Sequence, residues 1–598
     1  MGFRRCTLAV LVSAQPERPD DTVAGYLAAR LSQLGVTHVF ELVGGMITVL
    51  IDAAHRNPEL TIVSMHHEQG AGFAAEGFTR VSGRPAIAMA TSGPGATNLL
   101  TAVGSCYFDS TPVVFITGQV NTHELRRDGR GRQGGFQETD IVDMARPVTK
   151  WAVRVDSANA FPSLLEKAFA VAREGRPGPV LLDIPMDVQR ARVAAPMSTP
   201  PEPGDPESDA RRAGRRAVFL DALTRSLGRA ERPLVLAGGG VRLAHATTSL
   251  KELVERLGIP VVTSLMGVDI LDDSSPLRAG LIGSYGNRWA NWAVAESDVL
   301  IVLGSRLDTR QTGSDVTGFR GDRTVFHVDI DDGELNNHVA GCVVLNDDLA
   351  TFLDAATEVL QLPGRDLSPW MTAIAERRRE WPDDEENVPV VGINPNRAIQ
   401  EICHSWDDVG VFVTDVGQHQ MWAAQSVRLA PGQRFVTSGG MGSMGFGLPA
   451  AIGAALAQPS RPVCLVVGDG GLQCNIQELQ TAVRTRADVR IVVFDNGSLG
   501  MVRQFQQSYF DSRFYSTSWG YSAPDFVAVA RAYGLPAFSV TTHAELSSAL
   551  VAVRSDVSGP SLIRLQIDGE LNAYPKMAFG RAFGSMEPLV LPTEMEGT

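Results

Sequence analysis

The strongest constraint on the fold is a series of short apolar segments that recur along the chain at helix-length intervals. They lie at residues 61–64, 86–90, 113–117, 180–184, 233–237, 260–263, 299–303, 324–329, 410–415, 463–467 and 489–494. Polar side chains do not alternate with apolar ones in these segments, so both faces of each strand are expected to be buried. Burial on both faces is typical of parallel strands covered by helices on each side. The pattern predicts an α/β chain built from doubly wound parallel sheets.

Two linker-like stretches divide the 598 residues into three blocks. One is the proline-rich stretch at 196–206 and the other is the acidic stretch at 380–387. A length of 598 residues suggests three or four domains at about 100–200 residues each. We expect an N-terminal domain at 20–192, a linker at 193–214, a middle domain at 215–365, a linker at 366–388 and a C-terminal domain at 389–570. Residues 1–19 are expected to form a disordered tail, and residues 571–598 a tail that wraps the surface.

Composition excludes several classes of function. The formal net charge of −14 argues against general affinity for nucleic acid or for an anionic membrane. No apolar stretch approaches the roughly 20 residues that cross a bilayer, and the apolar run at 6–12 is a weak match to a signal peptide. The six cysteines include no CxxC pair, which favours reduced thiols and a cytoplasmic location.

The segment from 463 to 496 predicts an anion and metal site. An apolar strand ends at Gly468-Asp469-Gly470, a helix is expected at about 475–485, and a second strand ends just before Asn496. One right-handed crossover brings Asp469 and Asn496 to the carboxyl ends of two parallel strands. A carboxylate with an amide oxygen suits Mg²⁺, and glycines before a helix let backbone N–H groups approach a phosphate. An ordinary Asp-Gly turn is the alternative.

This segment resembles the metal and diphosphate motif of thiamine-diphosphate enzymes. The stretches at 416–425 (VGQHQMWAAQ) and 438–454 (SGGMGSMGFGLPAAIGA) are similar to those of acetolactate (acetohydroxyacid) synthase. The resemblance covers roughly residues 20 to 570. It implies three α/β domains, which bind pyrimidine, a flavin-type group and diphosphate. It also implies a carboligase that decarboxylates pyruvate or a similar 2-oxo acid and transfers the acyl carbanion to a carbonyl acceptor.

The same resemblance assigns roles in the C-terminal domain. Asp469, Asn496 and the backbone carbonyl of Ser498 would hold Mg²⁺, and Met444 would lie beneath thiamine diphosphate and keep its two rings bent. Without the resemblance, Met444 is ordinary core packing. The other cofactor-binding residues implied here are Val416, Gly417, Gln418, His419, Gly442, Gly470, Gly471, Leu499, Gly500 and Met501.

In the first block, His66-His67-Glu68 precedes a run of small residues. From the residues alone it fits either a metal cluster or a solvated helix face. The resemblance implies that Glu68 is the activating carboxylate. Hydrogen-bonded to the pyrimidine N1′, it favours the tautomer whose 4′-nitrogen removes the C2 proton. Gly44, Gln137 and Met444 are the other implied catalytic residues, and Gly45, Pro94 and Asn98 are implied cofactor contacts. The loop 91–98 is otherwise a tight turn.

The middle block contains stretches that resemble the FAD-binding segments of acetolactate synthase, where the flavin has no electron-transfer role. The residues implied are Gly239, Gly240, Ser264, Leu265, Met266, Gly283, Arg306, Arg310, Asp329, Ile330 and Asp347. Arg306 would pair with the diphosphate of FAD, and Asp329 and Asp347 with ribose or adenine groups. A middle domain without flavin is the alternative.

The chain departs from the family pattern around the substrate pocket, which we assign to Met46, Phe136 and Phe505. Val43-Gly44-Gly45-Met46 replaces a Pro-Gly-Gly-Ala turn, and Phe505 replaces a substrate-selecting Trp. Asp140 replaces a Pro and Thr309 an Asp. One side chain in a pocket changes discrimination by about 1–3 kcal/mol.

The acceptor therefore remains open. It is a second 2-oxo acid, giving acetolactate, or another carbonyl such as a keto-sugar in a specialised pathway. The alternatives are a pyruvate-oxidase-like or decarboxylase-like enzyme and a non-catalytic subunit of the same fold. The family also implies a homodimer or homotetramer whose sites combine Glu68 from one subunit with the metal site of another.

Overall fold

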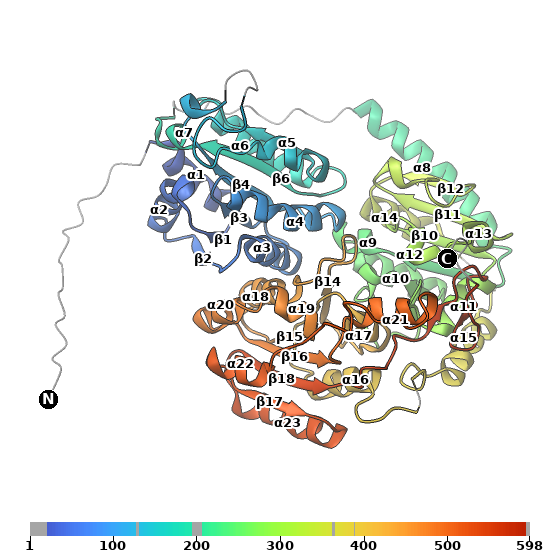
Figure 1. The fold of residues 1–598 in the computed structure, drawn as a ribbon. Helices are drawn as coiled ribbons and strands as arrows, with labels where there is room; N and C mark the ends of the chain where they lie inside the picture. The colour runs from blue at the N-terminus through green and yellow to red at the C-terminus, as the bar shows by residue number, and fades with distance from the viewer. Residues whose placement is uncertain (1–20, 127–130, 194–205, 362–364, 388, 594–598) are drawn as a thin grey trace.

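The computed structural model describes residues 21–126, 131–193, 206–361, 365–387 and 389–593. It contains three six-stranded sheets of parallel strands, one in each block, with helices on both faces (Figure 1). The predicted doubly wound α/β architecture is confirmed. The expected tail at 1–19 and residues 194–205 of the expected first linker lie outside the described residues.

The N-terminal sheet has the strand order β2-β1-β3-β4-β6-β5. Its strands are β1 (His38–Leu42), β2 (Thr61–Ser64), β3 (Ile87–Ala90), β4 (Val114–Gln119), β5 (Trp151–Arg154) and β6 (Val180–Pro185). Its main helices are α1 (Val23–Gln33), α2 (Thr48–Arg56), α3 (Glu68–Ser82), α4 (Pro94–Phe108) and α6 (Phe161–Arg173), with short α5 (Ile141–Ala145) and α7 (Met186–Arg190).

The C-terminal sheet repeats this order as β14-β13-β15-β16-β18-β17. Its strands are β13 (Val411–Thr414), β14 (Arg434–Thr437), β15 (Val463–Gly468), β16 (Val489–Asp495), β17 (Ala537–Val540) and β18 (Ser561–Gln566). The helices are α16 (Pro395–Ser405), α17 (Gln418–Ser426), α18 (Gly447–Ala457), α19 (Asp469–Cys474), α20 (Glu478–Thr485), α21 (Gly500–Tyr509), α22 (Phe526–Ala532) and α23 (His543–Asp556). The two outer domains therefore share one topology.

The middle sheet has a different order, β12-β11-β10-β7-β8-β9. Its strands are β7 (Pro233–Ala237), β8 (Val261–Thr263), β9 (Arg278–Leu281), β10 (Val299–Leu303), β11 (Thr324–Asp329) and β12 (Val343–Asn346). The helices are α8 (Pro206–Leu227), α9 (Gly239–Leu243), α10 (Thr247–Leu257), α11 (Arg288–Glu296), α12 (Thr309–Thr312), α13 (Val316–Arg320), α14 (Leu349–Val359) and α15 (Ser368–Glu380).

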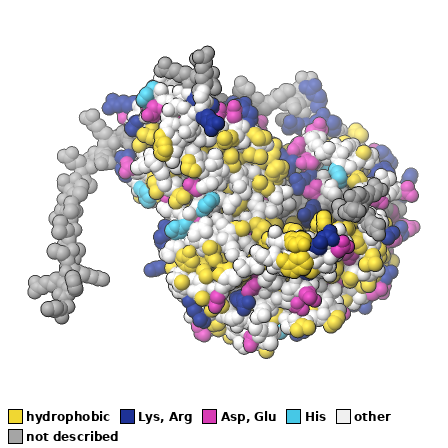
Figure 2. Space-filling view, viewed as in Figure 1, with side chains coloured by type: hydrophobic (Ala, Val, Ile, Leu, Met, Phe, Trp, Pro, Cys, Tyr) yellow, Lys and Arg dark blue, Asp and Glu magenta, His cyan; other side chains and the backbone are white. Residues whose placement is uncertain are grey.

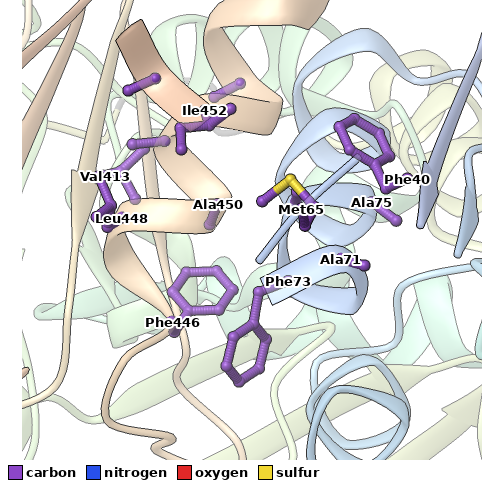
Figure 3. Close-up of a cluster of buried hydrophobic side chains, with 14 of the residues drawn as sticks. Phe40, Met65, Ala71, Phe73, Ala75, Val413, Phe446, Leu448, Ala450 and Ile452 are labelled. Atoms are coloured by element: carbon purple, nitrogen blue, oxygen red, sulfur yellow. The ribbon is translucent and has the colours of Figure 1, made fainter. Parts of the chain in front are cut away.

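The outer domains pack together through α3 and α18, and one apolar core runs across the joint. Phe73 of α3 meets Phe446 edge to face at 5.5 Å between ring centroids (Figure 3). A Cβ on Gly77 would stand 2.2 Å from the carbonyl oxygen of Ala450, and one on Gly453 would stand 2.0 Å from that of Ala74. The two helices therefore approach backbone to backbone, which only glycine permits at these positions.

The expected linker at 366–388 is wrong as an extended segment, because most of it forms α15. The stretch is rich in basic and acidic residues, so its apolar helix face is not evident from composition. Trp370 and Ile374 on that face are buried, and the Trp370 ring N–H donates to the Pro233 carbonyl at 3.1 Å. Residues 206–214 of the other expected linker belong to α8.

Two further expectations need revision. The helix expected at 475–485 corresponds to α20, and a further short helix, α19, precedes it and begins at Asp469 itself. The C-terminal segment does cross the surface, but it is anchored there. Ala573 and Met586 are buried, and β19 (Lys576–Met577) pairs with β20 (Met586–Glu587). Among the described residues, no helix is both long and apolar enough to cross a membrane.

Candidate active site

Glu68 begins α3 beside the loop that follows β3. The preceding His67 caps the helix, its Nδ1 accepting a hydrogen bond from the Gln69 N–H. Glu68 is buried, and its Oε2 accepts a hydrogen bond from Asn98 Nδ2 at 2.9 Å. Its Oε1 lies 3.1 Å from the place where a Cβ on Gly95 would stand. Gly95 and Asn98 belong to the start of α4, so most of the expected loop 91–98 is helical. Neutral groups at this helix start thus fix the carboxylate in place.

The turn after β1 lies against the same loop. The Met46 N–H donates to Thr91 Oγ1 at 3.2 Å, and a Cβ on Gly44 would stand 2.5 Å from Thr91 Cβ. The Met46 carbonyl accepts from Gln189 Nε2 at 2.7 Å. The structure therefore brings the turn 44–46 against Thr91, shortly before the start of the helix that carries Pro94 and Asn98.

Gln137 and Phe136, the other residues expected at the site in the N-terminal domain, differ from each other in their surroundings. A Cβ on Gly93 would stand 3.0 Å from Gln137 Cβ, so Gln137 lies against the loop 91–98. Gln137 also has a positive φ of 65°. Phe136 is 80 % exposed on a single chain.

The expected metal ligands lie where two neighbouring strands end. Asp469 follows β15 and Asn496 follows β16, and Gly468 is paired with Phe494 in the sheet. Asp469 Oδ1 accepts from the Gly470 N–H at 2.9 Å, whereas its buried Oδ2 has no hydrogen-bond partner among the described residues. Burial and the neighbouring Asp495 raise the pKa of Asp469 to about 7. A divalent cation beside Oδ2 would favour the ionised form.

The donor set fits Mg²⁺ better than a softer metal. Among the described residues, no group of three or more His, Cys, Asp or Glu side chains is arranged to hold a metal ion. Asp469, Asn496 Oδ1 and the Ser498 carbonyl are all oxygens, and hard oxygen ligands together with phosphate suit Mg²⁺. The residues present therefore fit the cation that the sequence predicts.

A cradle of glycines surrounds His419 at the start of α17. A Cβ on Gly417 would stand 2.6 Å from the His419 ring, and one on Gly468 would stand 2.8 Å from its Nδ1. His419 Nε2 is buried and has no hydrogen-bond partner among the described residues. Burial lowers the pKa of His419 to about 3, so the ring is neutral and its free nitrogen can serve a ligand. These features fit a diphosphate site.

Met444 lies across from the start of α19. A Cβ on Gly470 would stand 3.3 Å from Met444 Cε and 2.5 Å from Leu499 Cδ2. The loop that carries Met444 is held by Asp415, which accepts from the N–H groups of Gly445 and Gly447 at 3.1 and 2.7 Å. Asp415 is a positioning residue absent from the predicted set. An aspartate at the end of an apolar strand was the available signal.

The side chain of Gln418 is held by Asn496 and by the C-terminal segment. Its Oε1 accepts from Asn496 Nδ2 at 3.0 Å, and its Nε2 donates to the Leu571 carbonyl at 3.1 Å. Gly500 is buried against this amide, because a Cβ there would stand 1.9 Å from Gln418 Oε1. Met501, the second residue of α21, is partly buried against the hydrophobic core of the C-terminal domain.

A cavity of about 910 Å³ lies where the three domains meet. Its lining includes most residues expected to contact FAD: Gly239, Gly240, Ser264, Leu265, Met266, Arg306, Arg310, Asp329 and Ile330. Val416 and Gly442 line its other side, which connects it to the Met444 loop. Gly283 lies at its edge, where a Cβ would stand 2.5 Å from the Arg310 carbonyl oxygen.

Asp347 does not line this cavity, which contradicts its expected place beside ribose or adenine. Its Oδ1 accepts from Arg216 Nη2 at 3.0 Å, and both side chains are largely buried. Arg216 belongs to α8, so the ion pair fastens that helix to the end of β12. Of the two aspartates expected beside FAD, Asp329 is the one that lines the cavity, and burial raises its pKa to about 6.

Phe505 belongs to an aromatic group on α21. Its ring centroid lies 4.9 Å from that of Tyr509 and 5.7 Å from that of Phe510, and Phe505 is 43 % exposed. Figure 2 shows hydrophobic side chains gathered on this face, in the region where Figure 1 places α21. Phe505 is therefore partly accessible on a single chain, and its place in the substrate pocket stays a prediction.

Comparison with known families decides the assignment. Residues 21–144 match the N-terminal TPP binding domain of thiamine pyrophosphate enzymes, residues 220–356 their central domain and residues 415–565 their C-terminal TPP binding domain. The chain belongs to the thiamine pyrophosphate enzymes.

Within these enzymes, the acetolactate synthase large subunits resemble this chain over nearly all of its length. Isozymes 1 and 2 of Escherichia coli are each 36% identical to it over 94% of this chain, which covers 96% and 98% of their own lengths. The large subunit of Corynebacterium glutamicum is 35% identical over 95% of this chain and 90% of its own length. The chain is a member of the acetolactate synthase large-subunit family, as the motifs predict.

Proposed function

We propose that the protein is a thiamine-diphosphate-dependent carboligase of the acetolactate synthase type. It decarboxylates pyruvate or a similar 2-oxo acid and transfers the acyl group to a carbonyl acceptor. The observation that carries this proposal is the presence of both halves of the site. Glu68 is held at the start of α3, and Asp469 and Asn496 lie at the ends of β15 and β16.

Thiamine diphosphate, when bound, supplies the electron sink for decarboxylation and for carbon–carbon bond formation. Asp469, Asn496 and the Ser498 carbonyl would hold Mg²⁺, and the α19 N-terminus and the buried His419 would receive the diphosphate. Glu68 would hold a proton at the pyrimidine N1′, a role that suits a buried carboxylate in a neutral setting. Met444, beside Gly470, would fix the relative orientation of the two rings.

FAD in a non-redox role is proposed for the cavity between the domains. Its volume of about 910 Å³ lies in the range typical of cofactor sites, and it is lined by glycines and arginines of the middle domain. A flavin-free protein is the alternative. Its absorbance spectrum after purification and after incubation with FAD decides between them.

A homodimer or homotetramer with shared sites is proposed as the working assembly. Several side chains of the site are open on a single chain: Val43 is 57 % exposed, Phe136 80 %, Met441 43 % and Met444 39 %. A second copy of the chain would cover them. A cytoplasmic location, and no nucleic-acid or membrane partner, remain predictions from the sequence.

Product analysis tests the proposed activity. The enzyme is incubated with pyruvate, thiamine diphosphate, Mg²⁺ and a panel of acceptors comprising 2-oxo acids, aldehydes and keto-sugars, and the products are identified by mass spectrometry. A carboligation product supports the proposal and identifies the acceptor class. Acetaldehyde alone indicates a decarboxylase, acetate with flavin reduction indicates an oxidase, and no turnover of pyruvate or other 2-oxo acids indicates a non-catalytic subunit.

A further inference from the structure

Three side-chain amides, two of them buried, form a chain that ends at the proposed metal site. Asn496 Nδ2 donates to Gln418 Oε1 at 3.0 Å, and Gln418 Nε2 lies 3.4 Å from Gln504 Oε1. Gln418 is 3 % exposed and Gln504 is 1 % exposed. The chain connects α17 and α21 to the end of β16, and the function outlined above gives no role to Gln504.

The C-terminal segment determines the orientation of Gln504. The Ala573 N–H donates to Gln504 Oε1 at 3.0 Å, and Gln504 Nε2 donates to the Ala573 carbonyl at 3.1 Å. An amide side chain has one accepting end and one donating end. The backbone of a single residue therefore permits only one orientation of the Gln504 amide, with Oε1 facing Gln418.

This orientation is passed along the chain of amides. Gln504 Oε1 and the Leu571 carbonyl both accept, so they require the Gln418 nitrogen on their side. Gln418 Oε1 then faces Asn496 and requires its Nδ2. Asn496 Oδ1 is consequently directed to the other side, where it accepts from the Ser498 N–H at 3.2 Å and has a lone pair left for a cation. A reversed Gln418 would favour an Asn496 that presents N–H groups to the metal.

We propose that Gln504 is a positioning residue that, held by the Ala573 backbone, orients Gln418 and through it presents Asn496 Oδ1 to the metal. The proposal rests on the proposed function, because it takes Asn496 as a ligand of Mg²⁺. Groups behind the ligands of a metal typically change its affinity by about 10–100-fold when they are removed.

The test measures thiamine diphosphate binding by titration calorimetry at a series of Mg²⁺ concentrations, without substrate. Gln504→Met removes both ends of the amide, and we expect the Mg²⁺ concentration for half-saturation to rise by about 10-fold or more. Gln504→Glu still accepts from Gln418 Nε2, so we expect it to restore most of the affinity. Gln504→Leu is a second apolar replacement, used if Gln504→Met does not fold.

Gln507 provides the matched control. It also lies on α21 and accepts from Asn572 Nδ2 at 3.0 Å, but it holds the C-terminal segment by a residue outside the amide chain. Gln507→Met is expected to bind Mg²⁺ as the wild type does. Equal weakening in Gln504→Met and Gln507→Met, or no weakening in Gln504→Met, would overturn the proposal. Failure of the wild type to bind thiamine diphosphate with Mg²⁺ would instead overturn the proposed function.

Discussion

The N-terminal and C-terminal domains share one sheet topology and differ in what they place at equivalent points. The turn after the first strand is Gly44-Gly45-Met46 in one domain and Gly417-Gln418-His419 in the other. The loop after the third strand leads to Pro94 and Asn98 beside Glu68 in one domain, and to Asp469 in the other. In the proposed function, the same scaffold would present a carboxylate for proton transfer in one copy and a cation site in the other.

The surroundings of the two carboxylates explain the difference. Glu68 accepts from a neutral amide and lies against a glycine loop. Asp469 has a buried oxygen without a hydrogen-bond partner among the described residues and a second carboxylate, Asp495, nearby. A cation beside the unpartnered oxygen of Asp469 would offset the cost of burying that carboxylate. Chemistry in this fold is determined by the loops at the strand ends.

The largest expected effect separates the roles of these two domains. Glu68→Gln keeps the shape of the side chain and removes its charge, so we expect carbon dioxide release from pyruvate to fall by about 10²–10⁴-fold. Cofactor binding, measured by calorimetry, is expected to stay near that of the wild type. Undiminished turnover would contradict the assigned role of Glu68.

The corresponding change in the C-terminal domain, at Asp469, should weaken cofactor binding, which Glu68→Gln should leave near that of the wild type. Asp469→Asn removes a proposed metal ligand, so we expect thiamine diphosphate affinity in the presence of Mg²⁺ to fall by at least about 100-fold. Asp495→Asn is the control, because Asp495 is paired with Arg564 at 2.6 Å and is not an expected ligand. A smaller loss in Asp469→Asn than in Asp495→Asn would show that the metal site is misassigned.

The next prediction concerns the stability contributed by the contact between α3 and α18, which joins the two outer domains. Gly453→Ala places a methyl group against the backbone of α3, so we expect a loss of stability of about 1–3 kcal/mol. Thermal unfolding measures this loss. Gly214→Ala, at an exposed helical position with open space around it, should leave the melting temperature unchanged or slightly higher. Equal melting temperatures for the two variants would contradict the close packing.

The next prediction concerns the choice of carbonyl acceptor, which depends on the side chains that both domains contribute to the substrate pocket. Phe505→Trp restores the side chain typical of the family, and we expect the ratio of products from competing acceptors to shift toward a second 2-oxo acid by about 10–200-fold. Mass spectrometry of mixed-acceptor reactions measures the ratio. Phe510→Trp changes a neighbouring ring of the same group and serves as the control; a similar shift in both variants would remove Phe505 from the pocket.

The smallest expected effect concerns pH and the buried charges at the joint. Burial and Asp109 raise the pKa of Glu76 to about 7, although Arg80 opposes this shift. Because the folded-state pKa is raised, the contribution of Glu76 to stability is greatest at low pH and falls as pH rises from about 4.5 to about 7. Glu76→Gln should flatten the dependence of melting temperature on pH in this range, and exposed Glu59→Gln should not. An unchanged slope in Glu76→Gln would contradict the raised pKa.

The sequence predicts central strands better than edges. Central strands such as β4 and β16 are apolar on both faces and were identified directly. The edge strands β5 and β12 are half exposed, and their mixed composition resembles that of loops. The helix α15 was missed because its charged residues outnumber its two buried side chains, Trp370 and Ile374.

In the candidate site, residues that lie close in the sequence were easier to predict than contacts between distant segments. Asp469 and Asn496 belong to one crossover, so their neighbourhood follows from the sequence. The contacts of Gln504 with Ala573 use backbone atoms 69 residues away, and no side-chain pattern marks them. Asp347 pairs with Arg216, which lies 131 residues earlier on α8, and no local pattern in the sequence marks this pair.

The close packing of α3 on α18 also has a consequence for assembly of the chain during synthesis. The N-terminal domain emerges first, and its face around Phe73 has no cover until α18 follows more than 350 residues later. A fragment ending before residue 440 would expose this apolar face to solvent. The outer domains are therefore expected to acquire their stable form together, and separate expression of either one should give aggregated material.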